Sequence, residues 1–239
     1  MNARSGLLPR LALALMFLLP PGLAAAAAPV ASAPALVAGV DYLDIPDGAA
    51  FAPAPGHVEV VEVFGYTCGH CANFEPELRA WVAKLPQDVQ FTAIAAPFGG
   101  VWIPYAKAYY AAQSLGLAEA THEAMFQALH QERSLPVSSP TPEEIAGFYA
   151  QRGANAAEFV AAMSSPKVQA AMDRAQAFIR RSGVDGTPSL VVNGKYRVIG
   201  GKTYADLLRI TEALIARERA LLADAPAAPA ASKTGKRAK

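Results

Sequence analysis

The stretch HVEVVEVFGYTCGHC, residues 57–71, decides the fold of this 239-residue chain. Its first ten residues are rich in β-branched and aromatic side chains, which is typical of a buried strand. Directly after them come the only two cysteines of the chain, Cys68 and Cys71. Apolar residues then recur at helical spacing, at Phe74, Leu78, Trp81, Val82 and Leu85. The cysteines therefore lie at a strand-to-helix junction, with Cys68 at the helix N-terminus.

The spacing of the two cysteines favours thiol–disulfide chemistry. Two cysteines placed at random would fall three positions apart with a chance of roughly 1%. The first turn of a helix presents unpaired N–H groups and the positive end of the helix dipole. These groups should lower the pKa of the Cys68 thiol, while Cys71 is the shielded, resolving thiol. A stabilised thiolate also stabilises the reduced form, which makes the disulfide a better oxidant.

Three nearby residues are expected to tune this pair. His70 can donate a hydrogen bond or carry positive charge, and Gly69 leaves the loop less rigid than a proline would. Glu62 lies six positions before Cys68 in a strand that is otherwise apolar. It is either a surface carboxylate on an edge strand or a buried acid that relays protons or sets the thiol pKa.

Two other uses of the cysteines have weaker support. A structural bridge over so short a loop would add only about 2 kcal/mol to stability. A zinc site needs two further ligands; His57 and His70 are available, but His70 points from inside the loop. We therefore expect no metal and no cofactor other than a redox-active Cys68–Cys71 disulfide.

The rest of the chain alternates between strand and helix patterns. Further strands are expected at residues 40–45, 89–96, 189–192 and 196–199, the last two joined by a tight Asn193-Gly194 turn. Helices are expected at residues 104–115, 121–132, from 141 onward, 155–163, 167–179 and 203–222. Five of these helices interrupt strands that must share a sheet, which predicts an α/β fold with an inserted all-helical block.

The N-terminus has the pattern of a cleaved Sec signal peptide over residues 1–28. Arg4 and Arg10 precede an apolar run at residues 11–19, and small residues suitable for cleavage follow a Pro-Pro-Gly break. The run is too short to cross a bilayer as a helix, and the arginines are not adjacent as in a twin-arginine signal. An uncleaved membrane anchor is the alternative.

Two further segments are expected to lie outside the fold. Residues 29–38 have the composition of an Ala/Pro linker, and residues 223–239 that of a disordered basic tail. Without the charged residues of the ends, 15 basic and 19 acidic residues remain, so the folded part is mildly acidic. Because the whole chain carries a net charge of only +1, a nucleic-acid partner is not expected.

Several of these motifs together resemble the thioredoxin superfamily. They are FGYTCGHCANFEPE at residues 64–77, the helical insert, and Gly186-Thr187-Pro188-Ser189 before VVNGKY. The layout is most similar to DsbA-type periplasmic thiol:disulfide oxidoreductases. The resemblance implies a thioredoxin fold, with a mixed central sheet flanked by helices, over residues 39–99 and 183–222. Residues 100–182 would form the inserted helical domain.

The resemblance also implies roles for individual residues. Thr187-Pro188 would be a cis-proline loop facing the disulfide, with the Thr187 backbone open to an extended substrate; an ordinary strand-initiating proline is the alternative. DsbA relatives often pair a glutamate like Glu62 with a lysine on the next strand, but residues 90–94 contain none. Pro76, which should kink its helix, lies at the offset found in thioredoxin helices.

Weaker signals lie in the helical insert. His122 and His130 are expected to be exposed helix residues. Trp102 and Tyr105 follow a Gly-Gly pair and could line a substrate surface, although packing in the core of the insert is equally consistent with their positions.

Together these features predict a monomeric periplasmic oxidase that donates its disulfide to reduced, newly exported polypeptides. A substrate thiolate would attack Cys68, and a mixed disulfide would form and be resolved by a second substrate thiol. Because the enzyme ends reduced, it needs an electron acceptor, and the resemblance implies a membrane-embedded, quinone-linked DsbB-type partner. The alternatives are a disulfide isomerase or reductase, and a thioredoxin-like chaperone that binds unfolded polypeptides.

Overall fold

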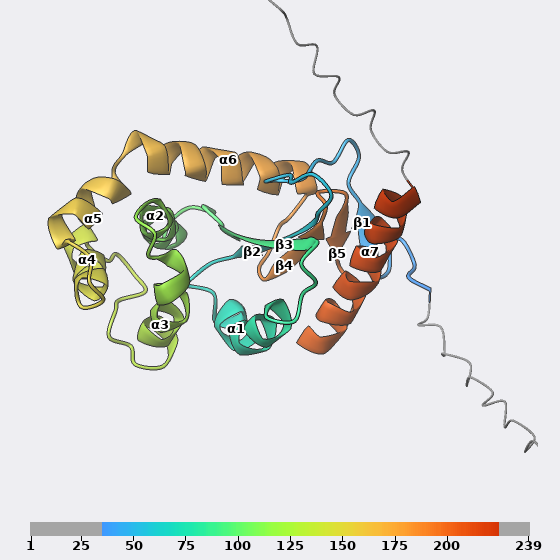
Figure 1. The fold of residues 1–239 in the computed structure, drawn as a ribbon. Helices are drawn as coiled ribbons and strands as arrows, with labels where there is room; N and C mark the ends of the chain where they lie inside the picture. The colour runs from blue at the N-terminus through green and yellow to red at the C-terminus, as the bar shows by residue number, and fades with distance from the viewer. Residues whose placement is uncertain (1–34, 225–239) are drawn as a thin grey trace, which may run out of the picture. The chain divides into compact units, whose positions relative to one another are not determined.

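The structure, a computed structural model, describes residues 35–224; the predicted signal peptide lies outside these residues, as do most of the linker and tail. A five-stranded sheet lies at its centre in the order β1-β5-β4-β2-β3 (Figure 1). The strands are β1 (Tyr42–Asp44), β2 (Val58–Phe64), β3 (Val89–Ala95), β4 (Ser189–Val192) and β5 (Tyr196–Val198).

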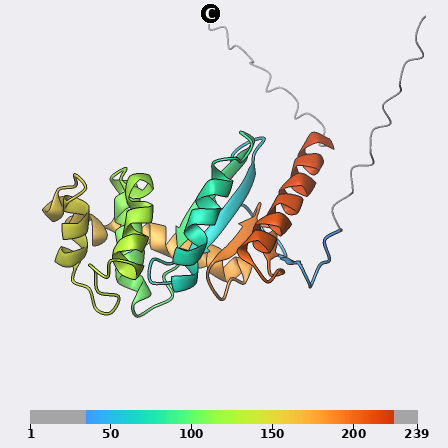
Figure 2. The same cartoon turned by 90° about the horizontal axis from the view of Figure 1, so that it is seen from below.

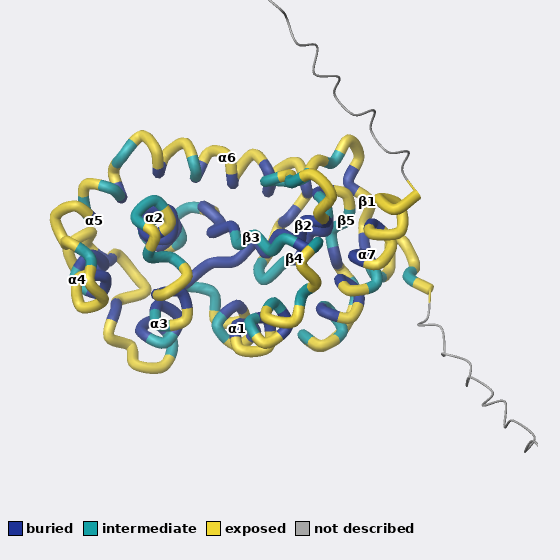
Figure 3. Tube along the Cα trace, in the orientation of Figure 1, coloured by how far each residue is buried: buried dark blue, intermediate teal, exposed yellow. Residues whose placement is uncertain are grey.

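Strand β2 leads to the cysteines and is the most enclosed part of the sheet. It pairs in parallel with β3 and antiparallel with β4, and all seven of its residues are buried (Figure 3). This confirms the buried strand predicted from its β-branched composition. Because side chains alternate along a strand, Glu62 shares a face with Val60, and Glu59 points to the opposite face.

Helices cover both faces of the sheet. Helices α1 (Gly69–Val82) and α7 (Tyr204–Asp224) lie on one face, and α6 (Pro166–Ser182) runs across the other (Figures 1 and 2). Helix α1 continues through Pro76. Helix α7 extends to Asp224, so the predicted start of the tail at residue 223 is wrong, because Ala223 and Asp224 complete its last turn.

The helical block lies between β3 and β4 in the chain, as predicted. Besides α6 it contains α2 (Trp102–Ser114), α3 (Ala118–His130), α4 (Pro142–Ala150) and α5 (Ala156–Met163). Its side chains share one hydrophobic cluster with the sheet, in which Phe64 and Ile94 pack with residues of α2 and α3. The arrangement confirms the predicted thioredoxin fold with a helical insertion. None of the helices within residues 35–224 is both long and apolar enough to span a membrane.

The β4–β5 hairpin is tied to α7 by a buried carboxylate. Asn193 and Gly194 both have positive φ angles, 53° and 66°, as the predicted tight turn requires. Glu218 of α7 accepts hydrogen bonds from the Asn193 amide at 2.6 Å and from Lys195 Nζ at 2.7 Å. Burial alone would raise the pKa of Glu218, but these two partners outweigh it and lower the pKa.

A second buried carboxylate holds the segment that precedes β2. Glu59 is 2% exposed and accepts hydrogen bonds from the N–H groups of Phe51 and Ala52 at 2.6 and 2.8 Å. The Thr92 hydroxyl on β3 donates to the same carboxylate at 3.1 Å. Glu59 therefore supplies acceptors for backbone groups that the sheet leaves unpaired.

Replacing Glu59 by leucine is expected to lower the free energy of unfolding by about 2–4 kcal/mol, because two backbone N–H groups lose their acceptor. Glu59→Gln keeps one acceptor oxygen and should cost clearly less. Denaturant unfolding of both variants measures the difference. Equal losses for the two variants would show that the hydrogen bonds do not matter.

Candidate active site

The turn between β2 and α1, residues 65–68, places the first cysteine. The Cys68 N–H donates to the Gly65 carbonyl at 3.0 Å, and Cys68 is the N-cap residue of α1, with φ −86° and ψ 113°. A Cβ atom on Gly65 would fall on the ring of Trp102 from α2. Glycine at this position therefore lets the helical insertion pack directly on the turn.

The two sulfur atoms have different surroundings. Cys68 is half-buried, whereas Cys71 is 1% exposed, and both are free thiols. The Cys71 N–H points at Cys68 Sγ at 3.2 Å, as expected for an N-cap side chain. Cys68 Sγ also lies 3.5 Å from the Thr187 carbonyl oxygen. One thiol is therefore accessible to a substrate and the other is shielded.

These surroundings separate the two thiol pKa values. A hydrogen bond from the Cys71 side chain lowers the pKa of Cys68 most, and contacts with Thr187 and the N–H groups of Cys71 and His70 lower it further. Against the opposing effect of partial burial, the pKa of Cys68 falls to about 5. Burial raises the pKa of Cys71. The direction for Cys68 agrees with that predicted from its place at the helix N-terminus.

The Thr187-Pro188 loop faces the cysteines, and its peptide bond is cis, as the resemblance implied. Thr187 and Pro188 are both half-buried. Gly69 and His70 are exposed, with open space where a Cβ of Gly69 would lie. The His70 carbonyl accepts a hydrogen bond from the Tyr204 hydroxyl at 2.9 Å, which joins the start of α1 to α7.

Glu62 lies inside the protein. It is 2% exposed, which decides between the surface and buried alternatives in favour of the buried acid. Burial raises the pKa of Glu62 well above its usual range, and Glu75 and Cys68 raise it further. The charge of Arg79 on α1 opposes this shift.

Comparison with known proteins identifies the family. Residues 59–210 match the DSBA-like thioredoxin domain. The chain belongs to this family. The thiol:disulfide interchange protein DsbA of Pseudomonas aeruginosa is 38% identical over 168 residues, which cover 70% of this chain and 78% of that protein. The corresponding protein of Azotobacter vinelandii is 36% identical over 183 residues, 76% of this chain and 84% of its own.

Solved structures show the same relationship. The crystal structure of the oxidoreductase DsbA from Xylella fastidiosa is 49% identical to this chain, with a TM-score of 0.76 over 77% of this chain and 98% of that one. The structure of Pseudomonas aeruginosa DsbA gives 35% identity and a TM-score of 0.70, over 78% and 96%. The protein is therefore a thiol:disulfide oxidoreductase of the DsbA type.

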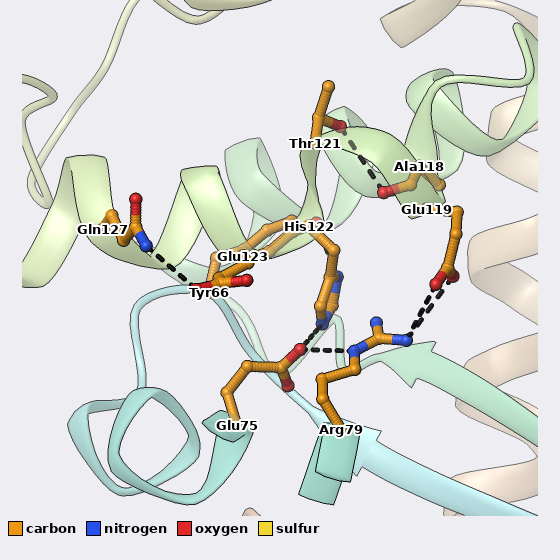
Figure 4. A network of polar contacts seen from close by, with 9 residues as sticks. All are labelled: Tyr66, Glu75, Arg79, Ala118, Glu119, Thr121, His122, Glu123 and Gln127. Carbon is orange, nitrogen blue, oxygen red and sulfur yellow. Dashed lines mark hydrogen bonds and ion pairs between the residues drawn. The ribbon is translucent and has the colours of Figure 1, made fainter. Parts of the chain in front are cut away.

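Helix α1 of this DsbA-like protein takes part in a polar network that no sequence pattern indicated (Figure 4). Glu75 Oε1 lies 2.6 Å from Arg79 Nε and 3.5 Å from His122 Nε2. Arg79 in turn reaches Glu119 on α3 at 3.2 Å. Burial alone would raise the pKa of Glu75, but His122 and Arg79 lower it. The network joins α1 to α3 of the insertion.

The prediction that His122 and His130 are exposed is wrong. His122 is 2% exposed, and His130 is half-buried. Both are turned inward because they share the helix face of Phe126 and the other apolar residues of α3. His122 lies three and four positions before Met125 and Phe126, a spacing that could have indicated its burial.

Trp102 and Tyr105 could each either line a substrate surface or pack in the core of the insertion, and the structure places them differently. Tyr105 is 1% exposed, and its hydroxyl donates to the Pro136 carbonyl at 2.6 Å, so it belongs to the core of the insertion. Trp102 is half-buried over the active-site turn, with the exposed Phe98 ring 5.2 Å away.

Within residues 35–224 no group of three or more His, Cys, Asp or Glu side chains is arranged to hold a metal ion.

In the reduced protein, the Cys68 thiol is expected to titrate at a pH of about 5. The folded pKa lies below the unfolded value of about 8.5. The thiolate therefore stabilises the reduced fold fully at pH values above the unfolded pKa, and this contribution is lost as the pH falls through the folded pKa. The free energy of unfolding of the reduced protein, relative to that of the oxidised protein, should thus decrease as the pH is lowered from about 8.5 to about 5.

Denaturant unfolding of both redox forms at several pH values, with ultraviolet thiolate absorbance on the reduced form, measures this effect. Cys68→Ser, which cannot form the disulfide, serves as the control, and its free energy of unfolding should lack the part of the pH dependence that the Cys68 thiolate gives the reduced wild type. A stability difference that stays constant between neutral and mildly acidic pH would contradict the assigned thiolate.

Proposed function

We propose that this oxidoreductase is a periplasmic oxidase that donates its Cys68–Cys71 disulfide to reduced, newly exported polypeptides. The observation that carries the proposal is the asymmetry of the pair: a half-exposed sulfur with a lowered pKa beside a buried thiol with a raised one. A stabilised Cys68 thiolate favours the reduced enzyme, and it therefore favours transfer of the disulfide to substrate.

The reaction begins with the oxidised enzyme. A substrate thiolate attacks Cys68 Sγ, the Cys68–Cys71 bond breaks, and Cys71 leaves and takes up a proton, which its raised pKa favours. A mixed disulfide then joins the substrate to Cys68. A second substrate thiolate attacks the substrate sulfur of this bond, and Cys68 leaves as a thiolate that accepts from the Cys71 N–H. The substrate loses two electrons and the enzyme gains them.

Substrate binding is assigned to Thr187 and Pro188. In the dithiol form the Thr187 carbonyl faces Cys68 Sγ at 3.5 Å, so a polypeptide joined to Cys68 would lie beside this loop. An extended substrate could pair with the Thr187 backbone as an added strand. The half-buried Trp102 and exposed Phe98 offer apolar surface on the side of the insertion.

Redox tuning is assigned to Gly69, His70 and Glu62. Gly69 and His70 form the exposed part of the loop between the cysteines, and the His70 N–H contributes to the lowered pKa of Cys68. Glu62 interacts electrostatically with Cys68 from below, and its raised pKa favours a neutral acid when the thiolate is charged.

The proposal includes the surroundings in which the enzyme works. The signal-peptide pattern of residues 1–28 supports export to the periplasm and cleavage. We further propose that the mature protein is a monomer. Because each cycle leaves the enzyme reduced, a DsbB-type membrane partner linked to quinone would accept its electrons. The disulfide itself is the only redox group that this cycle requires, and it requires no metal or nucleic acid.

Trapping of the intermediate tests the proposal. A Cys71→Ser variant is expected to accumulate mixed disulfides between Cys68 and exported polypeptides. Its Cys68 thiolate attacks a disulfide of such a polypeptide, one polypeptide thiolate leaves, and no Cys71 thiol remains to attack Cys68 and release the chain. Non-reducing electrophoresis of periplasmic extracts measures the adducts, and Cys68→Ser is the matched control that should form none. Absence of adducts from the Cys71→Ser variant would overturn the oxidase mechanism.

The equilibrium of the pair with glutathione separates an oxidase from the alternatives. A reduction potential of about −180 to −120 mV for the Cys68–Cys71 pair would support an oxidase, whereas a value of about −270 mV would indicate a reductase. A chaperone would still bind unfolded polypeptides after both cysteines are replaced by serine.

A further inference from the structure

Helix α3 of the insertion holds one residue of the active-site turn at two points. The Tyr66 hydroxyl lies 2.9 Å from His122 Nδ1, and the Tyr66 carbonyl oxygen lies 2.7 Å from His130 Nε2. The two histidines are eight positions apart, about two helical turns, so both rings lie on the face that meets Tyr66. Phe126, between them, packs edge-on against the Tyr66 ring at 5.1 Å.

The direction of these hydrogen bonds follows from their neighbours. Glu75 faces His122 Nε2 at 3.5 Å, which favours a hydrogen atom on that nitrogen and leaves Nδ1 as an acceptor. Burial raises the pKa of Tyr66 well above its usual range, so its hydroxyl keeps the proton and donates to Nδ1. A carbonyl oxygen can only accept, so His130 Nε2–H donates to it.

Tyr66 lies inside the turn that presents Cys68. The turn is closed by the hydrogen bond from the Cys68 N–H to the Gly65 carbonyl, and Trp102 packs on Gly65. The Thr67 hydroxyl is buried and has no hydrogen-bond partner within residues 35–224, so the Thr67 side chain does not secure the turn. Apart from the Cys71 thiol, which donates to Cys68, the hydrogen bonds from side chains to this turn therefore converge on Tyr66.

We infer that His122 and His130 are positioning residues that hold Tyr66, and through it the turn that aims the Cys68 sulfur at the first N–H groups of α1. The inference rests on Cys68 being the reactive thiol of the proposed function. It assigns to the helical insertion a direct part in setting thiol reactivity, in addition to any part in binding substrate.

Four variants isolate the hydrogen bonds from the packing. Tyr66→Phe removes only the hydroxyl, and His130→Leu removes the donor to the carbonyl. His130→Gln places an amide N–H close to the position of Nε2 and should rescue that bond. Met125→Leu, at a fully buried position of the same helix that makes no hydrogen bond to the turn, controls for altered packing.

Two measurements on the purified protein report on the thiol. They are the pH dependence of thiolate absorbance and the equilibrium constant with glutathione. For Tyr66→Phe and His130→Leu we expect the pKa of Cys68 to rise by about 0.5 and the equilibrium to shift about threefold toward the oxidised enzyme. His130→Gln and Met125→Leu should stay close to the wild type.

The Cys68 pKa values of the folded variants decide whether Tyr66 positions the turn. An unchanged Cys68 pKa in folded Tyr66→Phe, or an equal shift in Met125→Leu, would overturn the inference. If His130→Leu fails to fold, Tyr66→Phe still provides the test. Because neither measurement uses a polypeptide substrate, a wild-type protein that oxidises no exported polypeptide would refute the proposed function, and the positioning role would still be decided by the variants.

Discussion

The hydrogen bond from the Cys71 N–H to Cys68 Sγ, at 3.2 Å, is the interaction on which the rest of the site depends. It exists only if Cys68 caps α1, and it caps α1 only because the buried strand β2 ends one short turn earlier. The fold therefore places an anion at the positive end of a helix before any substrate arrives. The free energy that favours this thiolate in the reduced enzyme is the same free energy that, in the proposed function, would make the disulfide an oxidant.

The two cysteines differ in function because they differ in exposure. Cys71 lies one helical turn inside α1, where burial removes water from its sulfur and raises its pKa. The Cys68 sulfur is partly accessible to solvent, and on its inner side it accepts a hydrogen bond from the Cys71 N–H. An incoming thiolate can therefore reach Cys68 and not Cys71. In the proposed mechanism the better leaving thiolate, Cys68, is the one joined to the substrate, and the proposed direction of transfer follows from this difference in environment between two identical side chains.

Local patterns were enough to predict the strands, most helices and the cysteine pair, because each is encoded within a few consecutive residues. The cis-proline loop was implied by the family resemblance, since the Thr187-Pro188 dipeptide alone does not specify a cis bond. The helix ends differ from the predicted ones by at most three positions; α3, for example, begins at Ala118 and not at residue 121. The partners of the buried polar groups could not be predicted in this way. His122 finds its partner Tyr66 56 positions away, and Glu59 is buried by backbone groups of the segment before β2. A polar residue at an apolar spacing is ambiguous until its partner is known.

The groups that contact the Cys68 sulfur and the side chains that position its turn come from different parts of the chain. Groups that touch the sulfur, the N–H of Cys71 and the carbonyl of Thr187, come from the thioredoxin part of the chain. Side chains that secure the preceding turn, Trp102, His122 and His130, come from the insertion. Because the insertion shares one hydrophobic cluster with β2 and β3, a shift of α3 cannot leave the turn unaffected. Substitutions in the insertion can therefore adjust the reactivity of the cysteines while the residues that contact sulfur stay the same.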